Sequence, residues 1–270
     1  MKLKILFIIF LLQFLMTSVF CQEISIKIKS DYQEDSTTIR MVRTEITDDS
    51  ILNLVFVLPV EESKKYYRYG IGIDECKKLI DSSFIADNVV FIQPDYVRIP
   101  WYGNHVSNKE IWQLDYTIEV IKNAKTKYSN SDKNVRVFLV GFSKSGWGAM
   151  NILMSHSYLI DGVLIWDAPL SARRIDKWGM QQIFGDQDYF NRNYYLLREN
   201  GINTEELKNK KIVIGGYANF EDSSTEFLDL LDKNEIQYFH DSTLNYPHKW
   251  DKNWVYELLT YCNLTLKTKD

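Results

Sequence analysis

Residues 135–146, VRVFLVGFSKSG, decide the fold of this 270-residue chain. The first six are β-prone and mostly apolar, as in a strand that is buried on both faces of a parallel sheet. Gly141 and Gly146 then flank Ser143, and a run of small residues that is compatible with a helix follows. A serine between a buried strand and a helix N-terminus lies on a sharp turn, which projects its hydroxyl above the sheet. The helix N-terminus also stabilises negative charge near that hydroxyl.

The segments around this turn alternate between strand and helix patterns for about 200 residues. Further short apolar runs indicate buried strands at residues 51–60, 88–93, 162–166 and 211–214, with a last strand at 235–243. Helix-compatible stretches lie at residues 74–84, 109–128, 145–156, 224–234 and 251–261. Residues 25–30 and 38–46 alternate Ile with polar residues, which favours an antiparallel pair of half-exposed strands. Together these patterns predict an α/β protein with a doubly wound, mostly parallel sheet.

The domain organisation follows from two segments that do not fit this alternation. Residues 1–21 combine Lys2 and Lys4 with an apolar run and a plausible cleavage position after Cys21, which is typical of a secretory signal peptide. We therefore expect a secreted chain without a stable membrane span after cleavage. Residues 171–210 contain many aromatic side chains and no clear strand, so we expect a small helical cap inserted into one domain of residues 22–270.

Composition excludes several classes of function. The chain has 32 basic and 36 acidic residues, and no block of Lys and Arg suits a nucleic-acid backbone. No His, Cys and Asp cluster has the spacing of metal ligands, so we expect neither a metal nor a cofactor. Cys76 and Cys262 are compatible with a disulfide in a secreted protein and equally with two buried thiols. Asn263 begins a glycosylation sequon, which matters only in a eukaryotic host.

The motif from Gly141 to Ser145 resembles the nucleophile elbow, G-x-S-x-G, of the serine esterases of the α/β-hydrolase superfamily. Ser145 departs from the pattern, since the superfamily usually has glycine there, but serine is also small. The resemblance implies an α/β-hydrolase fold with Ser143 as the nucleophile. The other reading of Ser143 is a serine at a tight turn that caps the following helix.

The resemblance also implies an acid and a histidine after the serine, in that order. His248 lies between the last strand and the last helix, where the superfamily places its base. The other three histidines are less suitable: His105 precedes the serine, His156 ends the helix that Ser143 begins, and His240 lies within a predicted strand. Two acids remain open. The position of the superfamily's usual Asp is occupied here by Asn219. We slightly favour Asp222, which lies three residues beyond it. Asp167, at the end of an earlier strand, is the alternative.

The same resemblance implies an oxyanion hole and a substrate pocket. One donor is the backbone N–H of Lys144, and the second comes from Val60 or Glu61, in the loop after residues 51–60. Trp101, Tyr102 and His105 follow a central strand and are candidates for the pocket wall, although packing of the loop explains these side chains equally well.

These features predict a secreted serine hydrolase, most simply a carboxylic ester hydrolase that forms an acyl-enzyme on Ser143 with a small-molecule ester. A serine peptidase or an acyltransferase would use the same residues. A catalytically inactive hydrolase fold that serves as a binding protein is the alternative from another class, because Ser145 and Asn219 both depart from the superfamily's pattern.

Overall fold

A computed structural model describes residues 22–47, 51–62, 68–129, 134–197, 203–216 and 218–266. The predicted signal peptide, residues 1–21, lies outside the described residues. None of the described helices is long and apolar enough to cross a membrane.

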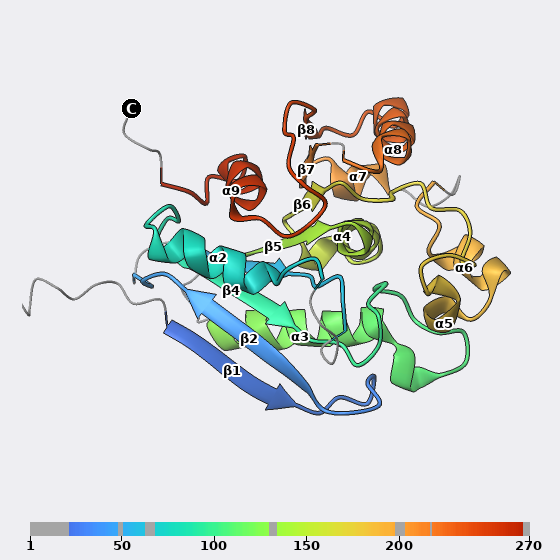
Figure 1. Cartoon of the computed structure of the whole chain (residues 1–270), viewed down its shortest axis with the longest axis horizontal. Coiled ribbons are helices and arrows are strands. Elements are labelled where there is room, and N and C mark those ends of the chain that lie inside the picture. Colours follow the sequence, from blue (N-terminus) through green and yellow to red (C-terminus); the bar gives the residue numbers. More distant parts are fainter. Residues whose placement is uncertain are drawn as a thin grey trace, which may run out of the picture.

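The centre of the molecule is an eight-stranded sheet with the strand order β1-β2-β4-β3-β5-β6-β7-β8 (Figure 1). Its strands are β1 (Gln22–Ile28), β2 (Thr37–Arg43), β3 (Leu52–Val57), β4 (Val89–Pro94), β5 (Val135–Phe142), β6 (Gly162–Trp166), β7 (Lys211–Gly215) and β8 (Phe239–Asp241). The β1–β2 and β2–β4 pairs are antiparallel, and all the other pairs are parallel. The predicted mostly parallel sheet, with an antiparallel pair at its start, is confirmed.

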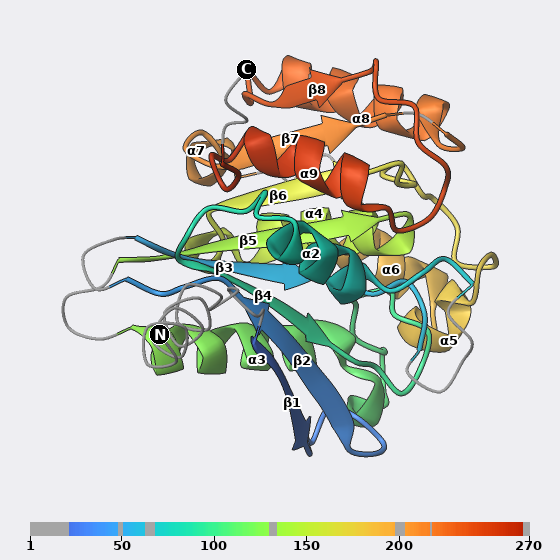
Figure 2. The same cartoon turned by 60° about the vertical axis from the view of Figure 1, so that its left-hand side comes forward.

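Helices cover both faces of this sheet, which explains why its central strands are mostly apolar. On one face lie α3 (Gln113–Tyr128), α4 (Lys144–Ser155) and α8 (Glu221–Lys233); on the other lie α2 (Gly72–Asp81) and α9 (Lys252–Thr260) (Figure 2). Every residue of β3 is buried, and its side chains alternate between the two apolar clusters, with Leu54 and Phe56 on the α3 side and Val55 and Val57 on the α2 side.

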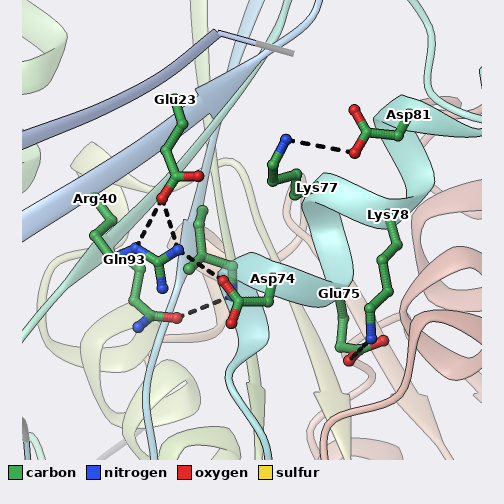
Figure 3. Close-up of polar contacts among 9 residues, drawn as sticks. Glu23, Arg40, Asp74, Glu75, Lys77, Lys78, Asp81 and Gln93 are labelled. Atoms are coloured by element: carbon green, nitrogen blue, oxygen red, sulfur yellow. Dashed lines mark hydrogen bonds and ion pairs between the residues drawn. The ribbon is translucent and has the colours of Figure 1, made fainter. Parts of the chain in front are cut away.

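A polar network ties the amino-terminal hairpin to α2 (Figure 3). The guanidinium of Arg40 on β2 lies 2.7 Å from Glu23 on β1 and 2.7 Å from Asp74 in the first turn of α2. The side-chain oxygen of Gln93 on β4 accepts a hydrogen bond from the backbone N–H of Ile73 at 3.0 Å. These contacts fix the start of α2 over the part of the sheet where antiparallel pairing gives way to parallel pairing.

The segment between β6 and β7 holds three short helices and no strand among its described residues. They are α5 (Met180–Phe184), α6 (Gln187–Asn193) and α7 (Thr204–Leu207). The helices α5 and α6 lie beyond the ends toward which the parallel strands point (Figure 2). Two single turns of 3-10 helix, Lys109–Ile111 and Ser157–Leu159, complete the helical elements of the described ranges.

Candidate active site

Ser143 stands between β5 and α4 in a backbone conformation that side chains rarely adopt, with φ 53° and ψ −129°. Its N–H lies 3.1 Å from the backbone oxygens of both Trp166 and Asp167, and its own carbonyl accepts from Gly146 and Trp147 at the start of α4. Strain of this kind persists only where the surrounding structure enforces it, and it concentrates at functional sites. The turn leaves the Ser143 side chain facing a cavity rather than the core.

The close approach of strand and helix explains the small residues around Ser143. A Cβ atom on Gly141 would lie 2.4 Å from the backbone oxygen of Ser145, and one on Gly146 would lie 2.7 Å from the Cβ of Ala168. Ser145 itself is fully buried, and its hydroxyl donates to the carbonyl of Phe142 at 2.9 Å and accepts from the N–H of the same residue at 3.0 Å. The departure at position 145 is therefore accommodated, because the serine satisfies its own hydroxyl on the turn.

Asp167 follows β6 directly, and its side chain is 1% exposed. One carboxylate oxygen accepts from the backbone N–H groups of Asn219 and Phe220, each at 2.9 Å, and the other lies 3.3 Å from the side-chain amide of Asn219. Burial alone would raise the pKa of the Asp167 carboxyl, but hydrogen bonds from His248 and from these two N–H groups outweigh it and hold the pKa below its ordinary value. Asp167 is therefore an ionised carboxylate in a buried position.

His248 lies in the loop between β8 and α9, and its Nδ1 atom is 2.6 Å from the second oxygen of Asp167. The rings of Phe142, Tyr69 and Phe220 surround the imidazole, with centroids 5.0, 5.7 and 5.7 Å away. A hydrogen bond from the N–H of Trp250 to the carbonyl of Tyr69, at 2.7 Å, holds the loop against the chain that follows β3. Because an ionised carboxylate can only accept, Nδ1 donates this hydrogen bond, and in a neutral imidazole the lone pair is then on the Nε2 atom.

Ser143 and His248 line one cavity of about 480 Å³. Lys144, the first residue of α4, lines it as well, so the positive end of that helix faces the same space. The other lining residues are Arg68, Tyr69, Trp101, Pro169, Trp178, Asn219 and Phe220. A nucleophile, a histidine oriented by a buried carboxylate, and a helix N-terminus are the components needed for acyl transfer.

Of the two candidate acids, the structure brings Asp167 and not Asp222 to the histidine. Asp222 is an exposed residue in the first turn of α8. The position between them, Asn219, instead contributes its amide to Asp167. The slight preference for Asp222 is corrected, because it rested on the usual order of strands, whereas the hydrogen bond of His248 goes to the end of β6.

The expected pocket wall is found in part. Trp101 lines the cavity, but neither Tyr102 nor His105 is among the described lining residues. Tyr102 is fully buried, and its hydroxyl donates to the carbonyl of Pro59 at 2.5 Å. The Nδ1 atom of His105 accepts from the backbone N–H groups of Ser107 and Asn108 and so stabilises its own loop. Packing of the loop, the other reading of these side chains, describes Tyr102 and His105.

Neither of the expected second oxyanion donors, Val60 and Glu61, is among the described residues that line the cavity. Val60 is buried beyond the end of β3, and the carboxylate of Glu61 accepts from the backbone N–H of Tyr69 at 3.3 Å. The other histidines lie where the sequence predicts them: His240 lies within β8, and His156 ends α4. Within the described ranges, no group of three or more His, Cys, Asp or Glu side chains is arranged to hold a metal ion.

Several residues that line the cavity are not indicated by any pattern in the sequence. Tyr69 and Arg68 follow β3 at a distance, and Phe220 precedes α8, so no local pattern connects them with Ser143. Trp178 carried a weak signal, an aromatic residue directly before Gly179 in the aromatic-rich segment. In the structure its indole is stacked on that of Trp101 with a centroid distance of 6.2 Å and an interplanar angle of 16°. Its backbone φ of 53° holds it at the mouth of the cavity, where the residue is 51% exposed.

Comparison with known proteins identifies the fold. No family model matches the chain, and neither does any curated protein sequence. Among solved structures, the chain is similar to the fluorophosphonate-binding serine hydrolase F of Staphylococcus aureus (15% identity, 89% of this chain and 98% of that one, TM-score 0.65). It is also similar to an S-formylglutathione hydrolase from Agrobacterium tumefaciens (12% identity, 92% of this chain and 97% of that one, TM-score 0.66). A ferulic acid esterase is similar as well (14% identity, 92% of this chain and 97% of that one, TM-score 0.63). The chain therefore has the α/β-hydrolase fold of these serine hydrolases and esterases.

Proposed function

We propose that this protein is a serine hydrolase that cleaves carboxylic esters through an acyl-enzyme on Ser143. The observation that carries the proposal is the arrangement around one cavity. A serine at a strained strand–helix turn faces the same space as a histidine whose Nδ1 atom is 2.6 Å from a buried carboxylate. A structural serine at a turn explains neither this histidine nor its carboxylate partner.

Each residue has a defined part in the proposed reaction. Nε2 of His248 takes the proton of Ser143 as Oγ attacks the ester carbonyl, and Asp167 holds the imidazole in the tautomer that makes this possible. The backbone N–H of Lys144 at the start of α4 stabilises the oxyanion. His248 then gives the proton to the oxygen of the leaving alcohol as the C–O bond breaks. Water attacks the acyl-enzyme in the second half, with the same histidine as base.

The size and lining of the cavity support a small-molecule ester. Its volume of about 480 Å³ falls within the range of pockets for small ligands. Similar structures include proteins named as esterases, among them the ferulic acid esterase. We also propose that the protein is secreted, on the basis of the signal-peptide pattern of residues 1–21.

Labelling with a fluorophosphonate, located by mass spectrometry, tests the nucleophile. The neighbour from Staphylococcus aureus is named for binding such reagents, and we expect one adduct on Ser143 that is absent from Ser143→Ala protein. Hydrolysis of a nitrophenyl acetate, compared with a peptide anilide, then separates an esterase from a peptidase. Folded protein that neither reacts with the reagent nor turns over any ester would contradict the proposal and favour a binding protein on the same fold.

A further inference from the structure

The charged side chains that line the proposed catalytic cavity all have one sign. Its lining includes two cationic side chains, Arg68 and Lys144, and no carboxylate among the described residues. The chain as a whole has more acidic than basic residues, with a net charge of −4, so the cationic lining runs against the average. The carboxylate of Asp167 lies behind His248 and is occupied by the imidazole and by the amides of Asn219 and Phe220.

Arg68 is the cation whose position carries the inference. Its guanidinium lies over the ring of Tyr69, 5.3 Å from the ring centroid, and Tyr69 in turn packs edge-to-face on the imidazole of His248. The Arg68 charge is therefore one aromatic ring away from the proposed base. None of the ion pairs found among the described residues includes Arg68. Glu61 approaches this segment, but its carboxylate accepts from the backbone N–H of Tyr69 and does not line the cavity.

Two arginines of the segment after β6 are already paired. Arg173 forms an ion pair with Glu226, and Arg174 pairs with Asp176 at 2.7 Å. Both arginines are more than half exposed, and neither belongs to the lining of the cavity that contains Ser143. The stretch of basic residues that opens the segment after β6 is thus a solvated surface.

The position of Arg68 relative to His248 determines which part of a bound ester lies near its guanidinium. In the proposed reaction His248 gives its proton to the leaving oxygen, so the leaving group lies against the imidazole. Arg68 and Tyr69 extend from that same imidazole. We therefore expect an anion on the leaving group to reach the guanidinium along the ring of Tyr69, and we expect an anion on the acyl group to lie farther from it.

We propose that the preferred substrates carry a carboxylate on the leaving alcohol, and that Arg68 is the residue that selects it. The inference rests on the proposed esterase function and specifies its substrate class. It requires no further reactant: the ester C–O bond breaks, the proton from Ser143 passes through His248 to the leaving oxygen, and the carboxylate stays unchanged at Arg68.

Two acetate esters that differ only in this charge test the inference. They are 4-acetoxybenzoate and its neutral amide, 4-acetoxybenzamide. The readout in each protein is the kcat/KM value of the charged ester divided by that of the neutral one. Comparing this ratio between the variant and the wild type cancels the difference in intrinsic reactivity between the two esters. In Arg68→Gln we expect the ratio to fall about fivefold, as for an exposed ion pair, and to fall further in Arg68→Glu. The difference between the variants should shrink in high salt, because exposed charges are screened.

Arg174→Gln is the matched control, since it removes the same charge from a surface outside the cavity, and it should leave the ratio as in the wild type. An unchanged ratio in Arg68→Gln, with both esters turned over, overturns the inference and leaves the esterase proposal standing. A second pair of esters, the phenyl monoester of adipic acid and its terminal amide, carries the charge on the acyl group instead. If Arg68→Gln changes the kcat/KM ratio of this pair alone, the anion lies on the acyl side and the inference is overturned. Calorimetric binding of 4-acetoxybenzoate to Ser143→Ala protein, with and without Arg68→Gln, tests the charge preference independently of turnover.

Discussion

At the scale of single residues, the acid partner of His248 is distinguished by its burial and by its hydrogen bonds. Asp167 is almost completely buried and accepts from the imidazole and from two backbone N–H groups. Asp222 is an exposed carboxylate at the first turn of α8, where it complements the helix N-terminus. Only the first can hold the imidazole in one tautomer.

Replacing each acid by its amide therefore has different consequences. We expect Asp167→Asn to lower kcat on a nitrophenyl ester about ten-thousandfold, as for the corresponding change in a known triad. Asp222→Asn, the matched control on the neighbouring helix, should change kcat by less than about twofold. Steady-state kinetics on the two purified variants decides between them. A large loss in Asp222→Asn, with Asp167→Asn close to wild type, would contradict the assignment.

Asn219 offers a second test of the same geometry. Its side-chain amide lies 3.3 Å from the Asp167 oxygen that contacts His248, so a carboxylate at position 219 comes within reach of the imidazole. In the Asp167→Asn background we expect Asn219→Asp to raise kcat at least about tenfold. In the wild-type background the same change places two carboxylates side by side, which raises the pKa of the pair and moves the acidic limb of activity to higher pH.

The control for this pair is Ala218→Asp, which adds the same charge one residue earlier. It should neither rescue Asp167→Asn nor move the acidic limb. Equal rescue by both variants would mean that the added charge acts through the general field of the site and not through the contact with His248.

At the scale of elements, the packing of α4 against β6 depends on Gly146. A Cβ atom there would lie 2.7 Å from the Cβ of Ala168, 3.0 Å from a methyl group of Ile165 and 3.1 Å from the carbonyl of Gly141. Two of these neighbours cannot move away, since one is a backbone oxygen and the other is attached directly to the backbone. The helix can accept a methyl group only by shifting away from the strand that carries Asp167.

We expect Gly146→Ala to lower the free energy of unfolding by about 1–3 kcal/mol, as for an overpacked core position. Urea denaturation followed by tryptophan fluorescence measures this loss. Ser155→Ala, at the exposed end of the same helix, should change the stability by less than about 0.5 kcal/mol. An unchanged midpoint in Gly146→Ala would show that α4 is not held as closely as these distances require.

At the scale of the whole molecule, the two described cysteines belong to one apolar cluster on the face covered by α2 and α9. Cys76 and Cys262 are both buried, and they are not joined in a disulfide. Burial raises the pKa of the Cys262 thiol to about 12. Because the thiolate is the reactive form, this thiol stays neutral and unreactive at pH 8 as long as the protein is folded.

Titration with Ellman's reagent at pH 8 should therefore detect neither thiol in the native chain from Gln22 onwards. Both should react once guanidinium unfolds the protein, since unfolding exposes both thiols and returns the pKa of Cys262 toward its ordinary value. A rise in the native reaction only at strongly alkaline pH is the expected pH dependence. Failure of both thiols to react after unfolding would mean that they form a disulfide.

The sequence by itself determined the sheet, its order of elements and the position of Ser143. Strands buried on both faces are apolar along most of their length, and a serine between such a strand and a helix requires small neighbours. Both constraints act on consecutive residues, so the sequence shows them directly. The position of His248 after the last strand followed from the order of elements. Ser145, which departed from the expected pattern, could be judged only from its hydrogen bonds to Phe142.

Only the tertiary structure decided which acid meets the histidine and which side chains form the cavity. Asp167 and His248 are 81 residues apart, and their contact depends on the path of the loop after β8. Tyr69, Trp178 and Phe220 come from three separate connections that converge at the carboxyl edge of the sheet. The reason is physical: periodicity reports which residues are buried, whereas contacts between loops depend on packing over distances that no local pattern records.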